Sequence, residues 1–205
     1  MTDKHGTLNV TGTGSVQVAP DEAVICLSLV TEARTAVEAT ANNATATQGV
    51  INAVTAQPNH GVITTAMTVG PILSYDQGTG VSTIVGFRAT SGVEVKTKVG
   101  YAGQLYDAGI QAGATQSSGI TFRIQNEAPY REEALRLAVE VAYREAKIVA
   151  KAAHLELMGV ESTQIDAGGG RVIYRSEATL KTTTPVLPED KTISATVHVV
   201  FRTRS

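Results

Sequence analysis

The sequence predicts an α+β fold in which a mixed, mainly antiparallel sheet is covered by helices. Runs that alternate apolar and polar residues, such as residues 93–98, predict strands, and apolar residues at spacings of three and four predict helices. A Gly-rich turn at residues 77–80, between two strand-like runs, predicts a hairpin. The expected order is β-β-α-β-β-α-β-α-β-β, with one long helix in the C-terminal half. A doubly wound parallel sheet is the alternative.

Two strands are expected at the start of the chain, over residues 8–18 and 23–30. Gly12 and Gly14 interrupt the alternation of the first strand, which indicates a bulge or a bend. A Pro-Asp turn at residues 20–21 separates the two strands. We therefore expect them to pair as a hairpin.

A helix is expected from Thr35 to about Gln57. Thr35 and Glu38 have the spacing of a capping box, which marks a helix start. The stripe expected to face the sheet consists of Val37, Ala41, Ala44, Gln48, Ile51 and Val54. Many of the remaining positions hold Thr or Asn, which are weak helix formers. Packing rather than intrinsic propensity must therefore stabilise this helix.

The middle of the chain should contain a hairpin, a short helix and one more strand. The hairpin strands are residues 62–75 and 83–98. The short helix is expected over residues 101–114, with Gly113 near its end. Residues 120–125 alternate cleanly and should form the strand that follows.

The strongest helical pattern begins at Pro129, which suits a first helical turn. The helix should run for about 30 residues, roughly 45 Å, and Gly159 is expected just past its end. Its apolar stripe is rich in alanine, which permits close approach to a sheet, and consists of Leu135, Ala138, Ala142, Ala146, Val149 and Ala153. The expected ion pairs along this helix are Glu132–Arg136 and Glu140–Arg144.

The C-terminal part should hold a strand near residues 172–174, a loop at 177–189 and a closing strand at 192–201. A length of 205 residues suits one domain spanning residues 1–205. It also suits two intertwined lobes, at about 7–100 and 101–204.

Composition excludes several classes of protein. Hydrophobic residues at 42% and charged residues at 18% describe a globular chain rather than a disordered one. The net charge of −2 gives no electrostatic basis for nucleic-acid binding, and aromatics at 4% are too few for a base-stacking platform. Cys26 is the single cysteine, so it cannot form an internal disulfide and is expected to be a small core side chain.

The sequence predicts no catalytic, cofactor-binding or metal-ligating residue. Gly12-Thr13-Gly14 would need a third glycine where Gln17 stands to match a dinucleotide-binding loop. The glycines at 168–170 lack the Gly-Lys-Ser/Thr ending of a phosphate loop, and there is no Gly-x-Ser-x-Gly elbow. Four histidines are too far apart in the sequence for a typical zinc site: His5, His60, His154 and His198.

Other polar features have simple structural explanations. Three acidic pairs lie at expected turns or helix starts: Asp21-Glu22, Glu132-Glu133 and Glu189-Asp190. Capping and solvation explain them without acid–base catalysis. Glycosylation sequons at Asn9 and Asn43 are of a kind that arises by chance. The basic residues of the long helix are interleaved with Glu, which is typical of a solvated face.

Nothing in the sequence indicates a membrane span, because no stretch of apolar residues is long enough. The first seven residues are polar and run directly into a strand pattern, without an apolar leader. Two interpretations stay open: a cytoplasmic protein, or a periplasmic or cell-envelope protein whose leader has been removed.

Short motifs recur in a fixed order along the chain. They are VTGTGSV at residues 10–16, APDEA at 19–23, GFRA at 86–89, AGIQAGA at 108–114, ITF at 120–122, the alanines at 134, 138, 142, 146 and 150, and the closing strand of the tail 185–201. In this order and spacing they resemble the SIMPL-domain family, which includes the bacterial YggE-like proteins. The resemblance covers roughly residues 7–203.

The resemblance implies an α+β fold with a mixed sheet and no established catalytic residues. It implies export to the periplasm or cell envelope for bacterial members, a link of some members to oxidative-stress tolerance, and assembly of some into homo-oligomers. One eukaryotic member acts as an adaptor for a signalling kinase. No site residue can be carried over from the family.

We therefore expect a non-enzymatic envelope protein that needs no cofactor and works through self-association, as a homo-oligomer, or through binding a protein partner. The candidate surfaces are the hairpin tip at residues 75–83 and the loop at 177–190. The alternatives are a small-ligand binding protein and an enzyme with a dispersed site.

Overall fold

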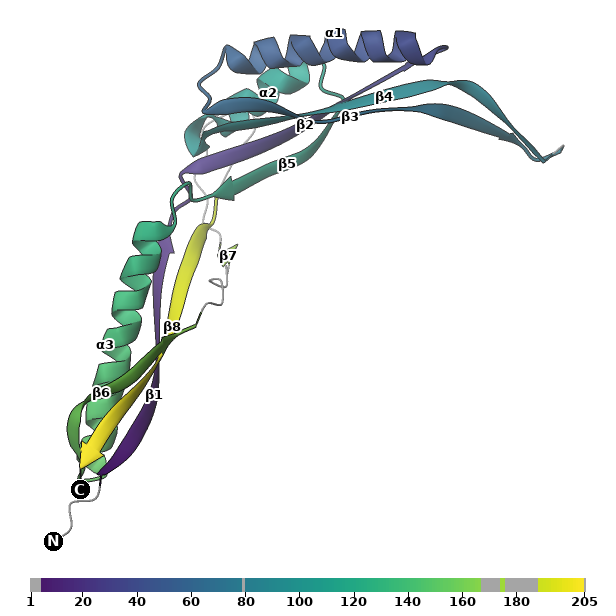
Figure 1. Cartoon of the computed structure of the whole chain (residues 1–205). Helices are drawn as coiled ribbons and strands as arrows, with labels where there is room; N and C mark the ends of the chain where they lie inside the picture. The colour runs from purple at the N-terminus through teal and green to yellow at the C-terminus, as the bar shows by residue number, and fades with distance from the viewer. Residues whose placement is uncertain (1–4, 79, 167–173, 176–187, 205) are drawn as a thin grey trace. The chain divides into compact units, whose positions relative to one another are not determined.

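The computed structural model describes residues 5–78, 80–166, 174–175 and 188–204 (Figure 1). The elements in chain order are β1 (His5–Val18), β2 (Glu22–Ala33), α1 (Ala36–Thr55), β3 (Gly61–Asp76), β4 (Val81–Lys98), a 3₁₀ turn η1 (Val99–Tyr101), α2 (Ala102–Gln111), β5 (Gln116–Arg123), α3 (Ala128–Ala152), β6 (Glu156–Ile165), β7 (Tyr174–Arg175) and β8 (Asp190–Arg204). The α+β class is confirmed, and the order of elements broadly matches the prediction.

The chain divides into two compact units. Unit 1 contains residues 1–19, 124–176 and 189–205, and unit 2 contains residues 20–123 and 177–188. The boundaries of these units differ from those of the two lobes expected from the sequence. Each unit has its own antiparallel sheet, so the strands belong to two sheets rather than one. The strand order is β1-β8-β6 in unit 1, where β7 also pairs with β8, and β3-β4-β2-β5 in unit 2.

The predicted hairpin between the first two strands is wrong. β1 pairs with β8 along its whole length, from His5 opposite Arg204 to Val18 opposite Lys191. β2 pairs instead with β4 and β5. Alternation and turn residues identify a strand and its end, but they do not specify its partner. The chain passes from unit 1 to unit 2 at the Pro-Asp turn, so β1 and β2 belong to different sheets.

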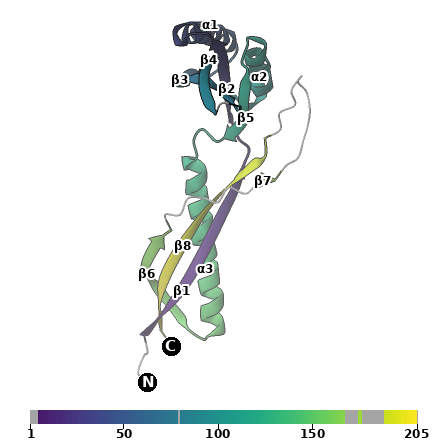
Figure 2. The ribbon, with the colours of Figure 1, turned by 90° about the vertical axis from the view of Figure 1, so that its right-hand side faces the viewer.

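In unit 1, α3 lies along β1 and β8 (Figure 2). The face of α3 toward the sheet is a line of fully or nearly fully buried alanines, at positions 134, 138, 142, 146 and 150. Val10, Val197, Val199 and Phe201 complete this core. The ring of Phe201 also meets Tyr143 edge-on, with 5.0 Å between the ring centroids. The alanine part of the predicted stripe is confirmed, but Val149 and Ala153 are exposed.

Gly12 and Gly14 do not mark a bulge, since the pairing of β1 with β8 runs through both without a shift in register. They allow β1 to approach the backbone of α3. A Cβ on Gly12 would lie 2.0 Å from the Ala138 carbonyl oxygen, and one on Gly14 would lie 2.2 Å from that of Ala134. Such distances are far inside van der Waals contact, so any larger residue would force the helix away from the sheet.

The long helix ends earlier than predicted, at Ala152. His154 takes a left-handed conformation with φ 53° just after it, which is the role expected of Gly159. The chain then forms β6, a strand that the sequence did not reveal because most of its side chains are exposed on both faces. Gly159 lies inside β6, with φ 133°, where the pairing with β8 shifts register.

Unit 2 packs α1 and α2 on one face of its sheet. The core includes Ile25, Leu27, Leu29, Val50, Val54, Val93, Val95 and Leu105. The Thr35 hydroxyl accepts a hydrogen bond from the Glu38 backbone N–H at 3.2 Å, which confirms the predicted helix start. Gly113, with φ 108°, follows the end of α2 as expected.

Of the stripe predicted for α1, Val54 is buried and Ile51 packs partly buried against the core, and the rest of the predicted face is wrong. The buried residues are Ala39, Asn43, Thr47, Val50 and Val54, whereas Val37 is 81% exposed. Polar contacts determine this choice of face. The side-chain amide of Asn43 donates to the carbonyl oxygens of Leu29 and Ala89, at 3.0 and 3.2 Å. The Thr47 hydroxyl donates to the Asn43 carbonyl oxygen at 2.7 Å and lies 2.5 Å from the Ser91 hydroxyl.

The hairpin between β3 and β4 is confirmed. Strand pairing continues to Asp76 opposite Val81. The Gly80 backbone N–H donates to the Asp76 carbonyl oxygen, and the Gly78 N–H donates to an Asp76 carboxylate oxygen, both at 2.8 Å.

We expect Gly12→Ala to lower the free energy of unfolding by about 3 kcal/mol, because the new methyl group would overlap the backbone of α3. Urea denaturation followed by circular dichroism measures this change. Gly70→Ala is the control: its Cβ would meet open space, so the change should be no more than about 1 kcal/mol. Equal stabilities of the two variants would contradict the close approach of β1 to α3.

Asn43→Ala should cost about 1–3 kcal/mol of stability, because it removes a buried side chain that bonds the backbone of two strands. The neighbouring Asn42 is exposed, so Asn42→Ala tests the same chemical change without burial. Thermal unfolding of both variants is the measurement. If Asn42→Ala were the more damaging, the assigned face of α1 would be wrong.

Candidate functional site: the β3–β4 arm

The β3–β4 hairpin continues past the strand that supports it. β4 pairs with β2 only as far as Phe87, which lies opposite Ala33. Farther out, the pairing that the structure describes is between residues 71–76 and 81–87. We call residues 71–87 the arm, and Figure 1 shows the hairpin extending beyond α1 and β2. A two-stranded ribbon is marginally stable in water by itself, so the arm is a segment that gains from a partner.

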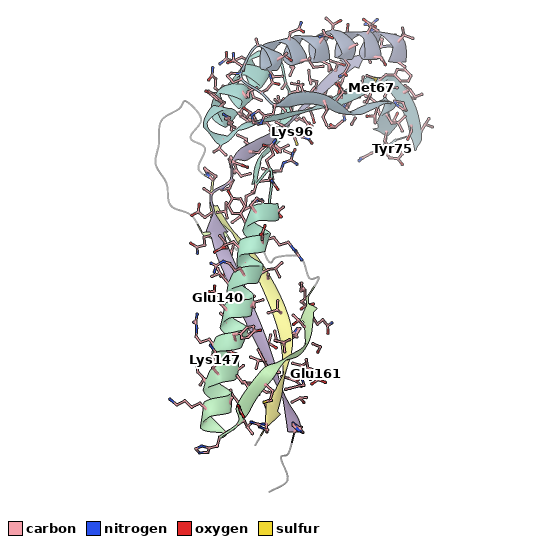
Figure 3. The ribbon with its side chains drawn as sticks, turned by 60° about the vertical axis from the view of Figure 1, so that its left-hand side comes forward. Met67, Tyr75, Lys96, Glu140, Lys147 and Glu161 are labelled. Atoms are coloured by element: carbon pink, nitrogen blue, oxygen red, sulfur yellow. The ribbon has the colours of Figure 1, made fainter. Side chains whose placement is uncertain are left out.

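Large apolar side chains form an exposed line along one face of this hairpin. This apolar stripe consists of Met67, Val69, Leu73 and Tyr75 of β3 and Ile84 of β4, which are between 51% and 66% exposed. Figure 3 labels Met67 and Tyr75. The four β3 members are separated by one or three residues, and Leu73 lies opposite Ile84, so all share one face of the hairpin.

The stripe lies on the face of the sheet where α1 packs. Met67 is opposite Ser91 in the strand pairing, and the Ser91 hydroxyl contacts Thr47 of α1. Directly opposed residues on neighbouring strands point to the same face. Ser91 and Ala89 on β4 are buried, whereas Met67 and Val69 on β3 stay exposed. The sheet face is therefore covered over β4 and over the start of β3, where Val62 packs against the core, and it is bare over β3 from Met67 outward.

The other face of the hairpin mixes polar and apolar residues, with Thr68, Gly70 and Ser74 beside Ile72. An open hollow of about 560 Å³ is lined by residues 68–73 together with Arg88 and Thr90. The Arg88 guanidinium already pairs with Glu32, at 2.7 and 2.8 Å. Neither Asp, Glu, Lys nor Arg occurs among residues 61–75 or 81–87, so the charges nearest to the stripe are Asp76 at the tip and Arg88 at the base.

A second hollow, of about 350 Å³, lies in unit 1 between α3 and the sheet. Its lining is Leu135, Arg136, Val139, Glu140, Thr163, Ile165 and Val197. The Arg136 guanidinium pairs with both Glu133 and Glu140. These contacts replace the predicted ion pairs Glu132–Arg136 and Glu140–Arg144. The hydrogen bonds of the guanidinium hold the pKa of Glu133 below the usual range, and the same contacts raise the pKa of Arg136. The cation is thus already neutralised.

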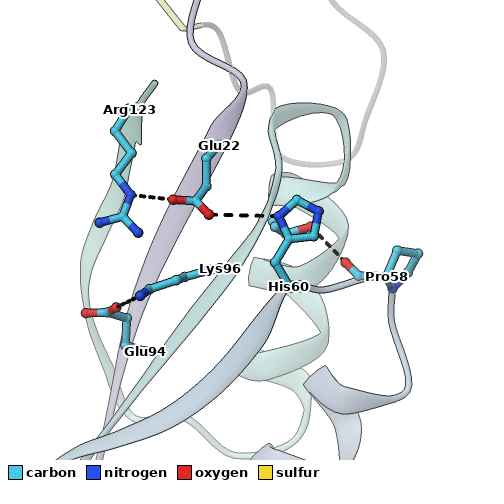
Figure 4. Close-up of polar contacts among 7 residues, drawn as sticks. Glu22, Pro58, His60, Glu94, Lys96 and Arg123 are labelled. Atoms are coloured by element: carbon cyan, nitrogen blue, oxygen red, sulfur yellow. Dashed lines mark hydrogen bonds and ion pairs between the residues drawn. The ribbon is translucent and has the colours of Figure 1, made fainter. Parts of the chain in front are cut away.

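A buried carboxylate lies at one end of the sheet of unit 2 (Figure 4). The Glu22 side chain is only 4% exposed and pairs with the Arg123 guanidinium on β5. The His60 Nδ1 atom lies 3.8 Å from the other Glu22 oxygen. Glu22 and Arg123 are directly opposed in the pairing of β2 with β5. The cluster therefore connects an edge strand to the centre of the sheet, which is a structural role.

The four histidines lie in separate parts of the fold. His5 begins β1, His60 contacts Glu22, His154 follows α3, and His198 on β8 lies 2.9 Å from the Thr11 hydroxyl. Within the described ranges, no three His, Cys, Asp or Glu side chains gather as a potential metal site. Cys26 is partly exposed rather than fully buried.

The two glycosylation sequons and the two candidate surfaces differ in where they lie. Asn43 is buried, so its sequon lies inside the fold, whereas Asn9 is exposed on β1. Of the two candidate surfaces, the hairpin tip at 75–83 forms the end of the arm. Residues 167–173 and 176–187, which include the Gly-rich turn and most of the 177–190 loop, lie outside the described residues.

The sequence indicated a candidate surface at the hairpin tip but not its extension back to Met67. Residues 67–75, MTVGPILSY, alternate, except at Ile72, as a strand with one buried face does, and only the structure shows that this face is bare.

We expect Arg123→Met to cost about 1–3 kcal/mol, less than for a fully buried pair because Arg123 is itself 43% exposed. The substitution leaves the Glu22 carboxylate buried without its main cation. Adding Glu22→Gln should restore part of the loss. Chemical denaturation measures all three chains, and Arg88→Met, which breaks an exposed pair, is the control. An equal loss of stability in Arg123→Met and Arg88→Met would show that the Glu22 cluster stabilises the fold no more than a surface ion pair does.

No helix in the described part of the chain is long and apolar enough to cross a membrane. The chain is similar to two proteins named "26 kDa periplasmic immunogenic protein", from Brucella melitensis biotype 1 and from Brucella abortus strain S19. Each is 29% identical to it over 164 residues, which cover 77% of this chain and 65% of the relative. The chain thus spans somewhat under two thirds of the length of these relatives.

Residues 8–201 match the family described as "SIMPL: Protein of unknown function (DUF541)". The match takes in both sheets, the three helices and the arm. The resemblance stated from the short motifs is therefore confirmed, and the chain belongs to the SIMPL family.

Proposed function

We propose that this protein is a non-enzymatic component of the cell envelope that works by self-association, and that the arm is the surface through which copies meet. The observation that carries the proposal is the apolar stripe, which is exposed on a strand whose sequence alternates as though that face were buried. Exposed apolar patches of this kind mark association surfaces.

The absence of charge supports a second copy of the chain as the partner. In a two-fold contact the same patch meets itself, so a patch carrying charges of one sign would repel its copy. The hairpin carries no charged residue over 61–75 or 81–87, so two arms can approach without repulsion. A basic or acidic partner would find no complementary charge there.

Location in the periplasm is part of the proposal and is supported by the names of the two Brucella relatives. A non-enzymatic role is supported by the chemistry of the hollows. The arginine beside each hollow is already paired with carboxylates, and the buried Glu22 is held by Arg123. A contribution to stress tolerance would be exerted by the assembled protein.

Light scattering over a wide range of protein concentration tests the proposal. We expect the wild type to exceed its monomer mass of 21.4 kDa. The double substitution Leu73→Glu and Ile84→Glu should weaken association at least about tenfold, because it places charges in the contact. Val37→Glu, at a still more exposed apolar position on α1, should have no effect. A wild type that stays monomeric at every concentration would refute self-association.

A further inference from the structure

We propose that two copies meet face to face, apolar stripe against apolar stripe, and that they do not join by adding strands edge to edge. This inference rests on the proposed function and specifies how its surface works. It concerns β3, which is both the outermost strand of its sheet and the strand that carries most of the stripe.

The outer edge of β3 is interrupted in two places. Pro71 has no backbone N–H, and proline within a sheet occupies edge strands with its nitrogen directed away from the partner strand. Thr65 is an extra residue between Thr64, opposite Val93, and Ala66, opposite Gly92, so the strand bulges there. Proline and bulges are the devices that prevent further strands from pairing with an edge. The longest uninterrupted stretches that remain are residues 66–70 and 72–76.

The stripe provides the alternative contact. Its side chains stand on one face of β3, and the residues of the other face are small or polar at Thr68, Gly70 and Ser74, with Ile72 as the apolar exception. A sheet face with this alternation is half of a two-layer packing, in which a second sheet lies about 10 Å away. α1 supplies that second layer over β2 and β4, where Leu29 and Ala89 are buried. α1 also contacts the start of β3, where Val62 packs against the core, but from Met67 outward the second layer is missing.

A second arm can supply the missing layer. Two stripes in contact bury Met67, Val69, Leu73, Tyr75 and Ile84 from each copy. Each arm by itself is a two-stranded ribbon, which gains stability when packed against a further layer. A β-branched, aliphatic and aromatic stripe without charge is also complementary to itself in chemistry.

Thiol labelling on adjacent positions distinguishes the two faces. All chains carry Cys26→Ser, which removes the native thiol. Val69→Cys and Thr68→Cys are nearly isosteric changes at neighbouring exposed positions, one in the stripe and one on the other face. The chains are first reduced and freed of the reductant, because reductants react with maleimide. Maleimide labelling rates are then measured in deoxygenated buffer at protein concentrations below and above the onset of association, so each variant serves as its own reference.

We expect association to slow labelling of Val69→Cys at least about tenfold, as in the water-excluding core of an interface. Labelling of Thr68→Cys should change less than twofold. In a second pair, association should likewise slow the labelling of Leu73→Cys and leave the labelling rate of Ser74→Cys nearly unchanged. Equal protection of both members of a pair, or protection of Thr68→Cys and Ser74→Cys alone, would overturn the face-to-face contact.

The same data separate this inference from the proposed function. If the mass never rises with concentration, the proposed function fails and the labelling rates stay constant for every variant. If the mass rises and the stripe positions stay freely reactive, association occurs through another surface, and only the inference and the role of the arm fail.

Discussion

The close approach of β1 to α3 is the contact on which unit 1 depends. Gly12 and Gly14 lie against the backbone of α3, where Ala134, Ala138 and Ala142 present only methyl groups. With so little side chain between them, helix and sheet pack through backbone surfaces, and the larger residues Val197, Val199 and Phe201 fill the space on β8. This arrangement explains the short distance between a long strand and a long helix, and it makes two glycines irreplaceable in a strand where glycine is otherwise unfavourable.

Unit 2 fixes its helix by different means. The line of Asn43, Thr47 and Ser91 is polar, buried and hydrogen-bonded, and it joins α1 to β2 and β4. Buried polar groups are stable only when their hydrogen bonds are satisfied, so this line admits one rotation of the helix about its axis. The helix is accordingly held over the inner strands and the start of β3, and β3 from Met67 outward is left without cover.

That uncovered strand connects the fold to the proposed function. The same alternation of apolar and polar residues that builds the core on β2 and β4 continues on β3, but there it faces solvent. Pro71 and the bulge at Thr65 restrict strand addition at the edge. The stripe is thus available for packing, while open-ended sheet growth is discouraged. A protein that assembles through a defined face needs both properties.

Local sequence patterns predicted the α+β class, most strands and helices, the start of α1 at Thr35, the β3–β4 hairpin and the alanine face of α3. These features depend on local periodicity, capping and turn residues, which act over a few neighbouring positions. The position of the hairpin tip as a candidate surface came from the same local signals.

Strand pairing, the buried face of α1 and the exposure of the stripe depend on long-range packing and could be seen only in the folded chain. The partner of β1 is β8, almost the whole chain away, and no local pattern specifies a contact over that separation. As polar residues, Asn43 and Thr47 would be expected at the surface. They can be buried because Leu29, Ala89 and Ser91 provide their hydrogen-bond partners. Alternation along β3 predicts a face suited to burial, but whether another layer covers that face depends on where α1 lies, which is a property of the assembled fold.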